Sequence, residues 1–221
     1  MVTLKAMAKQ HGQKALLILI FLIGVCVRCI AFGDLPYGLN QDEASVAYDA
    51  YADMTYGMDR NGDHLPIYAV AWGSGQNMGY NYLARPFIAV FGLTTVAVRM
   101  PMLLLNCLSM LAFYGFAKIC FGQKTAMWAA FLLAICPWHI MLSRWALESN
   151  LAPAFLLFGL FFFILALEKH PAYYLLSALF YGLCLYTYAL MWIVVPVSLL
   201  LQIVYALVTR RARITWYTTG F

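Results

Sequence analysis

Two adjacent acidic residues, Asp42 and Glu43, stand at the predicted start of a helix and are the first candidates for chemistry. They follow Asn40 and Gln41, and Asn40 with Glu43 three residues later forms a capping-box pattern. The positive end of the helix dipole favours ionised carboxylates at such a position. An ionised carboxylate there can accept a proton from a hydroxyl group or bind a cation. The alternative interpretation is that both residues only cap the helix.

A second group of chemically capable side chains lies in the segment 143–150. Arg144 and Glu148 are four residues apart and would share one face of a helix. The planar guanidinium group matches phosphate oxygens, so Arg144 is a candidate phosphate ligand. The alternative is an exposed salt bridge worth less than about 1 kcal/mol. His64 lies in a turn-rich polar loop and is either a solvated turn residue or a further phosphate-binding candidate.

The composition excludes most classes of protein. The chain has 221 residues, of which 64% are hydrophobic and 10% are charged, and its mean hydropathy is +0.78. Soluble domains carry roughly 25% charged residues, and a disordered chain, a coiled coil or a secreted disulfide scaffold would have a different composition.

The net charge of +5 comes from short scattered groups without interleaved aromatic residues, so no nucleic acid is expected as a partner. The six cysteines are expected to be inert thiols buried in the membrane.

Unbroken apolar stretches of about twenty residues predict an all-α, polytopic transmembrane bundle, since a helix needs about this length to cross hydrocarbon. A membrane-spanning barrel would show alternating segments of about ten residues instead. The last two spans share one apolar block broken by Pro196, which is expected to form either two short spans or one span and a half-helix. Arg28, near the end of the first span, is expected to snorkel to the interface, with a functional ion pair as the alternative. Six spans are expected, at about 15–32, 100–117, 126–142, 151–167, 173–193 and 194–208.

A long polar segment, 33–99, separates the first two predicted spans. It contains seven of the nine acidic residues of the chain. The apolar stretch 79–92 within it is too short to cross a membrane and is interrupted by Arg85 and Pro86. A stretch of this length is more typical of an interfacial or re-entrant segment.

The part of this segment from residue 42 to residue 56 has the spacing of an amphipathic helix that ends at Gly57. Tyr48 and Tyr51 fall on its apolar face, and Asp49 and Asp53 fall on another face, four residues apart. This pattern predicts a helix that lies on the membrane surface with its tyrosine face towards the lipid.

The distribution of charge predicts the orientation. With 79–92 on the same side as the rest of its loop, the opposite side of the membrane holds nine basic residues: Lys5, Lys9, Lys14, Lys118, Lys124, Lys169, Arg210, Arg211 and Arg213. Eight of the nine acidic residues then lie on the side of the loop. The positive-inside rule therefore predicts a multi-pass cell-membrane protein with a cytoplasmic N-terminus and with segments 33–99 and 143–150 outside the cytoplasm.

The order of several motifs resembles the N-terminal half of the GT-C membrane glycosyltransferases. The similarity covers nearly the whole chain and points to the bacterial protein O-mannosyltransferase-like (glycosyltransferase family 39-like) proteins and to the aminoarabinose transferases of lipid A. The motifs are Leu-Asn-Gln-Asp42-Glu43 after the first span, a Gly-x-Asp-x-x-Gly stretch followed by Pro66-x-Tyr68, Phe91-Gly92-Leu followed by Val98-Arg99, and Pro137-Trp-His-Ile-Met-Leu-Ser-Arg144-Trp-Ala-Leu-Glu148-Ser-Asn-Leu.

The resemblance implies an enzyme that moves a sugar from a polyprenyl-phosphate carrier in the membrane lipid to an acceptor outside the cytoplasm, whose nature stays open. It places the role of catalytic base on Asp42, with Glu43 beside it. It places a further acidic role on Glu148, where the family often has Asp. Arg144 and Arg85 would bind the carrier phosphate, with His64 as a further donor-binding candidate. No cofactor is implied beyond the lipid-linked donor, and a metal is not implied, although a divalent ion would be compatible with these residues.

One departure from the family concerns length. Its members carry further spans and usually a distal outer domain, so residues 1–221 are expected to be the N-terminal transmembrane region of a longer or split enzyme. The alternatives are a non-enzymatic membrane module, which assembles with partner helices or flips a lipid carrier, and an inactive fragment. A transporter is disfavoured because the predicted spans contain almost no internal acidic residue.

Overall fold

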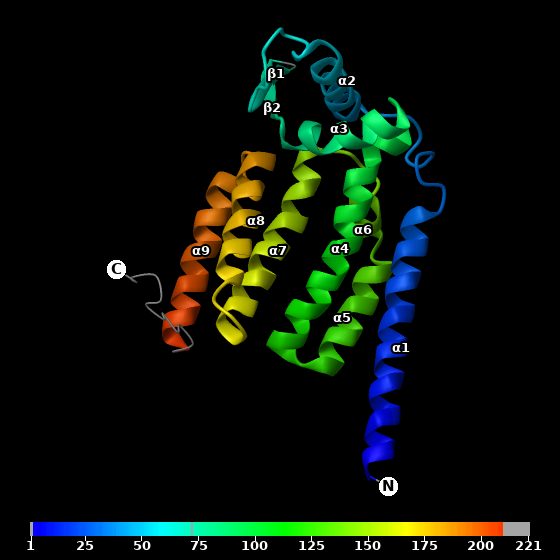
Figure 1. Cartoon of the computed structure of the whole chain (residues 1–221), viewed down its shortest axis with the longest axis vertical. Helices are drawn as coiled ribbons and strands as arrows, with labels where there is room; N and C mark the ends of the chain where they lie inside the picture. The colour runs from blue at the N-terminus through cyan, green and yellow to red at the C-terminus, as the bar shows by residue number, and fades with distance from the viewer. Residues whose placement is uncertain (1, 72, 210–221) are drawn as a thin grey trace.

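The computed structural model describes residues 2–71 and 73–209, with side chains from residue 11 onwards, and shows a bundle of helices covered at one end by a smaller layer (Figure 1). We call this layer, residues 30–94, the cap layer. It contains α2 (Gln41–Tyr56), the strands β1 (Tyr68–Ala71) and β2 (Ser74–Asn77), and α3 (Gly79–Phe91). The bundle consists of α1 (Val2–Cys29), α4 (Thr95–Phe121), α5 (Gln123–Ile135), α6 (Pro137–Leu142), α7 (Glu148–Glu168), α8 (Tyr173–Thr187) and α9 (Met191–Val208).

The long helices of the bundle have the length and composition of membrane spans. Within the described part of the chain, four helices meet this criterion: residues 11–29 of α1, and the whole of α4, α7 and α9. Figure 1 shows α1, α5 with α6, and α8 running towards the cap layer, and α4, α7 and α9 running away from it. The all-α membrane fold predicted from the sequence is therefore confirmed, with one small antiparallel hairpin, β1–β2, added in the cap layer.

Two predicted span boundaries differ from the structure. The predicted span 126–142 is divided into α5 and α6 at Cys136, because Pro137 has no N–H with which to continue the helix. The predicted break at Pro196 is wrong, since Pro196 lies inside α9 and the chain leaves the helical conformation at 188–190 instead. α8 has only 15 residues, so the number of six spans stays a prediction.

The packing of α7 against α8 forms the largest part of the bundle core. Ser177 of α8 donates a hydrogen bond to the Gly159 carbonyl of α7, 2.8 Å away, which fixes the two helices at close range. A Cβ at Gly159 would lie 2.8 Å from the Tyr181 ring, so only glycine permits this approach. Aromatic rings fill the neighbouring space, with the Phe158 and Phe180 ring centroids 4.9 Å apart.

The short apolar stretch around residues 79–92 folds as predicted for a segment that does not cross the bundle. It forms α3, a helix of 13 residues that lies across the end of the bundle (Figure 1). Its Tyr80 side chain is fully buried and donates a hydrogen bond to the Val98 carbonyl of α4 at 2.8 Å. α3 therefore lies between the bundle and the rest of the cap layer and connects the two.

Helix α2 begins and ends as predicted, and its acidic face is the one that packs against the protein. The Asn40–Glu43 capping box is present, and Gly57 ends the helix with a positive φ of 72°. The acidic face is buried against the rest of the cap layer, where Asp49 pairs with Arg60. Tyr48, on the other face, is 55% exposed. Arginines from the loop and from α3 neutralise the buried acids, and the position of this helix on the membrane surface stays a prediction.

Arg28 does not snorkel to the interface. It is fully buried and donates hydrogen bonds to the carbonyls of Ala134 (2.9 Å) and Leu133 (3.1 Å) and to its own helix at Gly24 (2.8 Å). The Leu133 carbonyl also accepts the Cys136 N–H at 3.3 Å, whereas Pro137 has no N–H to offer the Ala134 carbonyl, and Arg28 supplies that donor. This guanidinium therefore fixes α1 to the end of α5.

The basic residues behind the predicted orientation are only partly described. The side chains of Lys14, Lys118, Lys124 and Lys169 are exposed on α1 or on the turns at the end of the bundle away from the cap layer. Arg210, Arg211 and Arg213 lie outside the described residues, as do the side chains of Lys5 and Lys9. The orientation of the chain in a membrane stays a prediction.

Candidate functional site

A cavity of about 450 Å³ lies where the cap layer meets the start of α7. Asp42 and Glu148, which are 106 residues apart in the chain, both line it. The walls of the cavity come mainly from the N-terminus of α2, from β2 and from the start of α7. The other lining residues are Asn40, Gln41, Ala71, Ser74, Gly75, Gln76, Leu147, Ser149 and Tyr188. The structure thus brings the two predicted acidic segments together around one polar hollow.

Asp42 owes its position to the capping box that starts α2. The Asn40 side-chain oxygen accepts a hydrogen bond from the Glu43 N–H at 2.7 Å, and the Asn40 N–H donates to the Glu43 carboxylate at 3.2 Å. These bonds fix the first turn of the helix and leave the Asp42 side chain exposed towards the cavity.

Glu43 points the other way, into the protein, and is 1% exposed. Its two carboxylate oxygens accept hydrogen bonds from Arg99 at 2.8 and 2.9 Å, so that the two side chains form a bidentate ion pair. One of these oxygens also accepts the Ala146 N–H at 2.8 Å. Because Ala146 is two residues before Glu148, this carboxylate ties the start of α2 to the start of α7. Glu43 therefore holds the two halves of the cavity together rather than lining it.

Arg99 was not among the residues singled out from the sequence, yet it is the centre of this junction. It is 0% exposed and also donates to the carbonyls of Pro36 (2.9 Å) and Gly38 (2.6 Å). These contacts fix the connection between α1 and α2. The available sequence signal is an arginine one turn inside an apolar helix, where an uncompensated charge would be costly, and this signal marks the position without naming its partner.

Glu148 is the first residue of α7 and is half-buried. One oxygen of its carboxylate is buried without a hydrogen-bond partner among the described residues. A buried acceptor of this kind costs free energy unless a donor reaches it. The carboxylate is therefore available to a hydroxyl or another donor that enters the cavity.

The predicted phosphate ligands do not line the cavity. Arg85 pairs with Asp53 of α2, donates to the Asn81 side chain at 3.0 Å and lies 4.2 Å from the centre of the Tyr82 ring. Burial raises the pKa of Asp53, and the neighbouring Arg85 opposes that shift. His64 is exposed in the loop after α2 and contacts the Gly57 carbonyl at 2.6 Å.

Arg144 lies closer to the junction than the other two. It is 7% exposed and donates to the Ile30 carbonyl at the end of α1, and its buried Nε has no partner among the residues that the structure describes. Burial and the positive charge of Arg99 lower the pKa of Arg144. Within the described residues Arg144 forms no ion pair, so its guanidinium group has capacity for an anion.

Among the described residues that line the cavity, none is basic. In the parts of the chain that the structure describes, no group of three or more His, Cys, Asp or Glu side chains is arranged to hold a metal ion. Gln76 and Tyr188, which sequence reasoning did not single out, line the hollow beside the two carboxylates. The chemistry that the walls offer is therefore that of carboxylate, amide and hydroxyl groups.

The comparison with protein families matches residues 76–220, about two thirds of the chain, to a family described as dolichyl-phosphate-mannose-protein mannosyltransferase. The matched segment includes Glu148, Arg144 and Arg99, whereas Asp42 and Glu43 precede it. Neither the curated proteins nor the solved structures give a significant match.

Proposed function

From the premise that the chain belongs to the dolichyl-phosphate-mannose-protein mannosyltransferase family, we propose that Asp42 is the base in the transfer of a sugar from a polyprenyl-phosphate carrier. Family membership makes the protein a membrane glycosyltransferase of the mannosyltransferase kind. The observation that carries the finer proposal is the cavity that Asp42 and Glu148 share at the junction of the cap layer with α7.

The proposed reaction needs one base and one leaving group. The acceptor hydroxyl oxygen bonds to the anomeric carbon of the sugar, the bond from that carbon to the phosphate oxygen breaks, and the phosphate leaves with the electron pair. The hydroxyl proton passes to Asp42, which must lie within hydrogen-bond reach of the acceptor. The transition state is oxocarbenium-like, and a single base on one face of the sugar favours inversion at the anomeric carbon.

Glu148 is proposed to orient the acceptor. Its buried carboxylate oxygen has no partner among the described residues, so an acceptor hydroxyl or amide donor can bind there while Asp42 takes the reacting proton. Two carboxylates of unequal exposure can divide these tasks, because Asp42 is exposed and Glu148 is half-buried. No step in this proposal requires a metal.

The carrier phosphate is proposed to bind at Arg144. This guanidinium has an unpartnered Nε and forms no ion pair among the described residues, and a positive charge there stabilises the leaving phosphate. The proposal gives no donor role to Arg85 or His64, because Arg85 already pairs with Asp53 and His64 is exposed in the loop after α2.

The side of the membrane also belongs to the proposal. The lysine side chains at the end of the bundle away from the cap layer favour a cytoplasmic position for that end. The cap layer and the cavity would then lie outside the cytoplasm, in the layer where a lipid-linked sugar can meet an acceptor.

The test is sugar transfer in membranes that contain the full-length protein and a radiolabelled polyprenyl-phosphate sugar. Asp42→Asn should lower the rate by about 10²–10⁴-fold, the usual contribution of a general base. Glu148→Gln should raise the KM for the acceptor more than it lowers kcat. Asp63→Asn is the matched control, since Asp63 is an exposed carboxylate of the same layer outside the cavity.

Normal transfer by Asp42→Asn would contradict the proposal. It would favour the alternative of a membrane module in which the apolar helices, and not the carboxylates, are the functional surface. Equal insertion and equal thermal stability of the three variants must be shown first, so that a loss of transfer reports on chemistry.

A further inference from the structure

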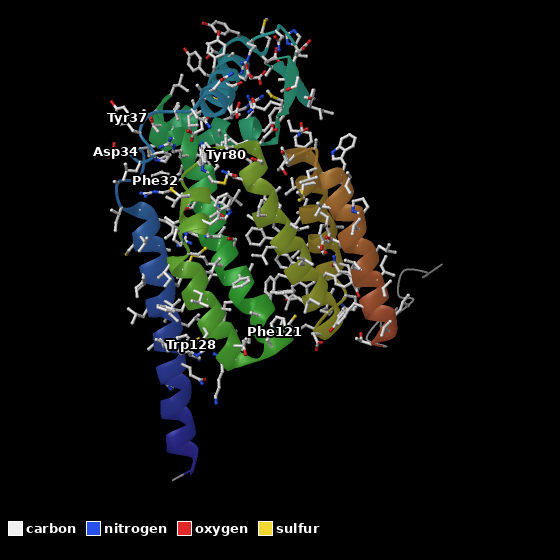
Figure 2. The ribbon with its side chains drawn as sticks, turned by 180° about the vertical axis from the view of Figure 1, so that it is seen from behind. Phe32, Asp34, Tyr37, Tyr80, Phe121 and Trp128 are labelled. Atoms are coloured by element: carbon white, nitrogen blue, oxygen red, sulfur yellow. The ribbon has the colours of Figure 1, made fainter. Side chains whose placement is uncertain are left out.

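A second cavity of about 450 Å³ lies between α1 and α5, in the half of the bundle away from the cap layer. Figure 2 shows Trp128 beside α1 at this level. The cavity is distinct from the carboxylate site in its elements and in its chemistry. Its lining residues are Gln13, Leu16, Leu19, Ile20, Ile23, Gln123, Lys124, Met127, Trp128 and Phe131.

The walls of this groove are apolar and open to the surroundings of the bundle. Leu16 and Leu19 of α1 are 50% and 53% exposed, and Trp128 of α5 is 70% exposed. Residues 11–29 of α1 have the length and composition of a membrane span, and only 17% of the most apolar window is buried. In a membrane this surface faces hydrocarbon, so an acyl chain is the natural occupant of the groove.

The polar residues of the groove gather at one end. Gln13, Gln123 and Lys124 lie at the start of α5 and the facing part of α1. The Gln123 amide already donates one N–H to the Tyr114 hydroxyl at 2.9 Å and keeps a second N–H, so that two amide groups and an ammonium group can donate hydrogen bonds here. The lining contains no acidic side chain. Lys14 and Lys118, both exposed, add positive charge on the neighbouring turns of α1 and α4. The mouth of the groove is thus electrostatically complementary to an anionic headgroup.

We propose that the groove between α1 and α5 binds one anionic glycerophospholipid. An acyl chain lies against Leu16, Leu19 and Ile23 on one wall and against the α5 side chains on the other. The headgroup phosphate binds the Lys124 ammonium, with the Gln13 and Gln123 amides as further donors. A zwitterionic lipid offers the same chain but adds a cation at a mouth that is already positive.

The experiment uses tryptophan fluorescence in vesicles, because Trp128 lies in the groove and bromine on an acyl chain quenches a neighbouring indole. The whole chain is reconstituted into phosphatidylcholine vesicles with a minority of either dibrominated phosphatidylglycerol or dibrominated phosphatidylcholine. The same measurement on Trp128→Phe is subtracted, so that the difference reports on Trp128 alone. The binding site predicts that the anionic brominated lipid quenches this difference signal at lower concentration.

Two lysine variants separate a site from a general effect of charge. Lys124→Gln should weaken the preference for phosphatidylglycerol roughly fivefold, the usual contribution of one basic residue near an anionic headgroup. Lys169→Gln removes an exposed lysine at the same end of the bundle, on the turn between α7 and α8, and should leave the preference unchanged.

Any one of four results would overturn the proposal. Equal quenching by the two brominated lipids would show that ordinary annular lipid fills the groove. Absence of quenching of Trp128 by either lipid would show that protein covers it. If Lys124→Gln retains the full preference, Lys124 does not bind the headgroup. If Lys169→Gln loses the preference, the preference is a general effect of positive charge and not a property of this groove.

Discussion

Removal of Arg99 should destabilise the junction between the cap layer and the bundle more than any other single charge change. Glu43 and Arg99 are 1% and 0% exposed and pair through two hydrogen bonds of 2.8 and 2.9 Å. Arg99→Leu leaves the Glu43 carboxylate buried with only backbone N–H partners. An uncompensated buried charge of this kind costs about 3–5 kcal/mol.

The other contacts of Arg99 place the effect in the upper part of that range. Its guanidinium also donates to the carbonyls of Pro36 and Gly38, and these acceptors lose their partner in the variant. For a chain of this length each kcal/mol lowers the unfolding midpoint by about 2–4 °C. At about 4–5 kcal/mol the midpoint of Arg99→Leu should therefore fall by about 8–20 °C.

The assay is thermal unfolding of the purified protein in detergent, followed by tryptophan fluorescence. Lys169→Leu is the control, since a substitution of an exposed residue changes stability by no more than about 0.5 kcal/mol. The double variant Arg99→Leu with Glu43→Leu should recover part of the loss, because an apolar pair can replace a buried ion pair at little cost. A midpoint for Arg99→Leu within about 2 °C of the wild type, or a double variant no more stable than the single one, would refute the reasoning.

Two further substitutions test the positions of α1 and α2. Arg28→Leu should destabilise the protein by about 1–3 kcal/mol, because it removes the guanidinium donor of the buried Ala134 carbonyl; an unchanged unfolding midpoint would instead support a snorkelling side chain. Asn40→Ala should cost about 0.5–2 kcal/mol through loss of the helix cap, whereas Asn40→Asp keeps an accepting oxygen and should cost less; equal midpoints for the two variants would contradict this.

Local sequence signals predicted α2 well, because everything that starts and ends it is local. Asn40 and Glu43 are three residues apart, and Gly57 supplies the positive φ at the end of the helix. The direction in which the helix faces was not predictable in the same way. It depends on the ion pairs of Asp49 with Arg60 and of Asp53 with Arg85. Arg85 lies in α3, 32 residues further along the chain than Asp53.

The meeting of Asp42 with Glu148 around one cavity follows from topology that the positions of the spans already suggested. The residue that secures this meeting, Arg99, escaped prediction because its partner Glu43 is 56 residues away. A charge near the start of an apolar helix has the same sequence signature whether it lies at the interface or is buried in an ion pair. Arg28 was misinterpreted for the same reason, since its acceptors belong to α5, more than 100 residues further along the chain.

The central claim, that positions 42 and 148 face one cavity on one side of the membrane, can be measured directly. Asp42→Cys and Glu148→Cys are introduced together into a chain without native cysteines, and intact cells are treated with a membrane-impermeant maleimide and with a short bifunctional thiol cross-linker. The account predicts that both thiols react from outside the cell and that the cross-linker joins them within one chain. Labelling of the two positions from opposite sides of the membrane would contradict it.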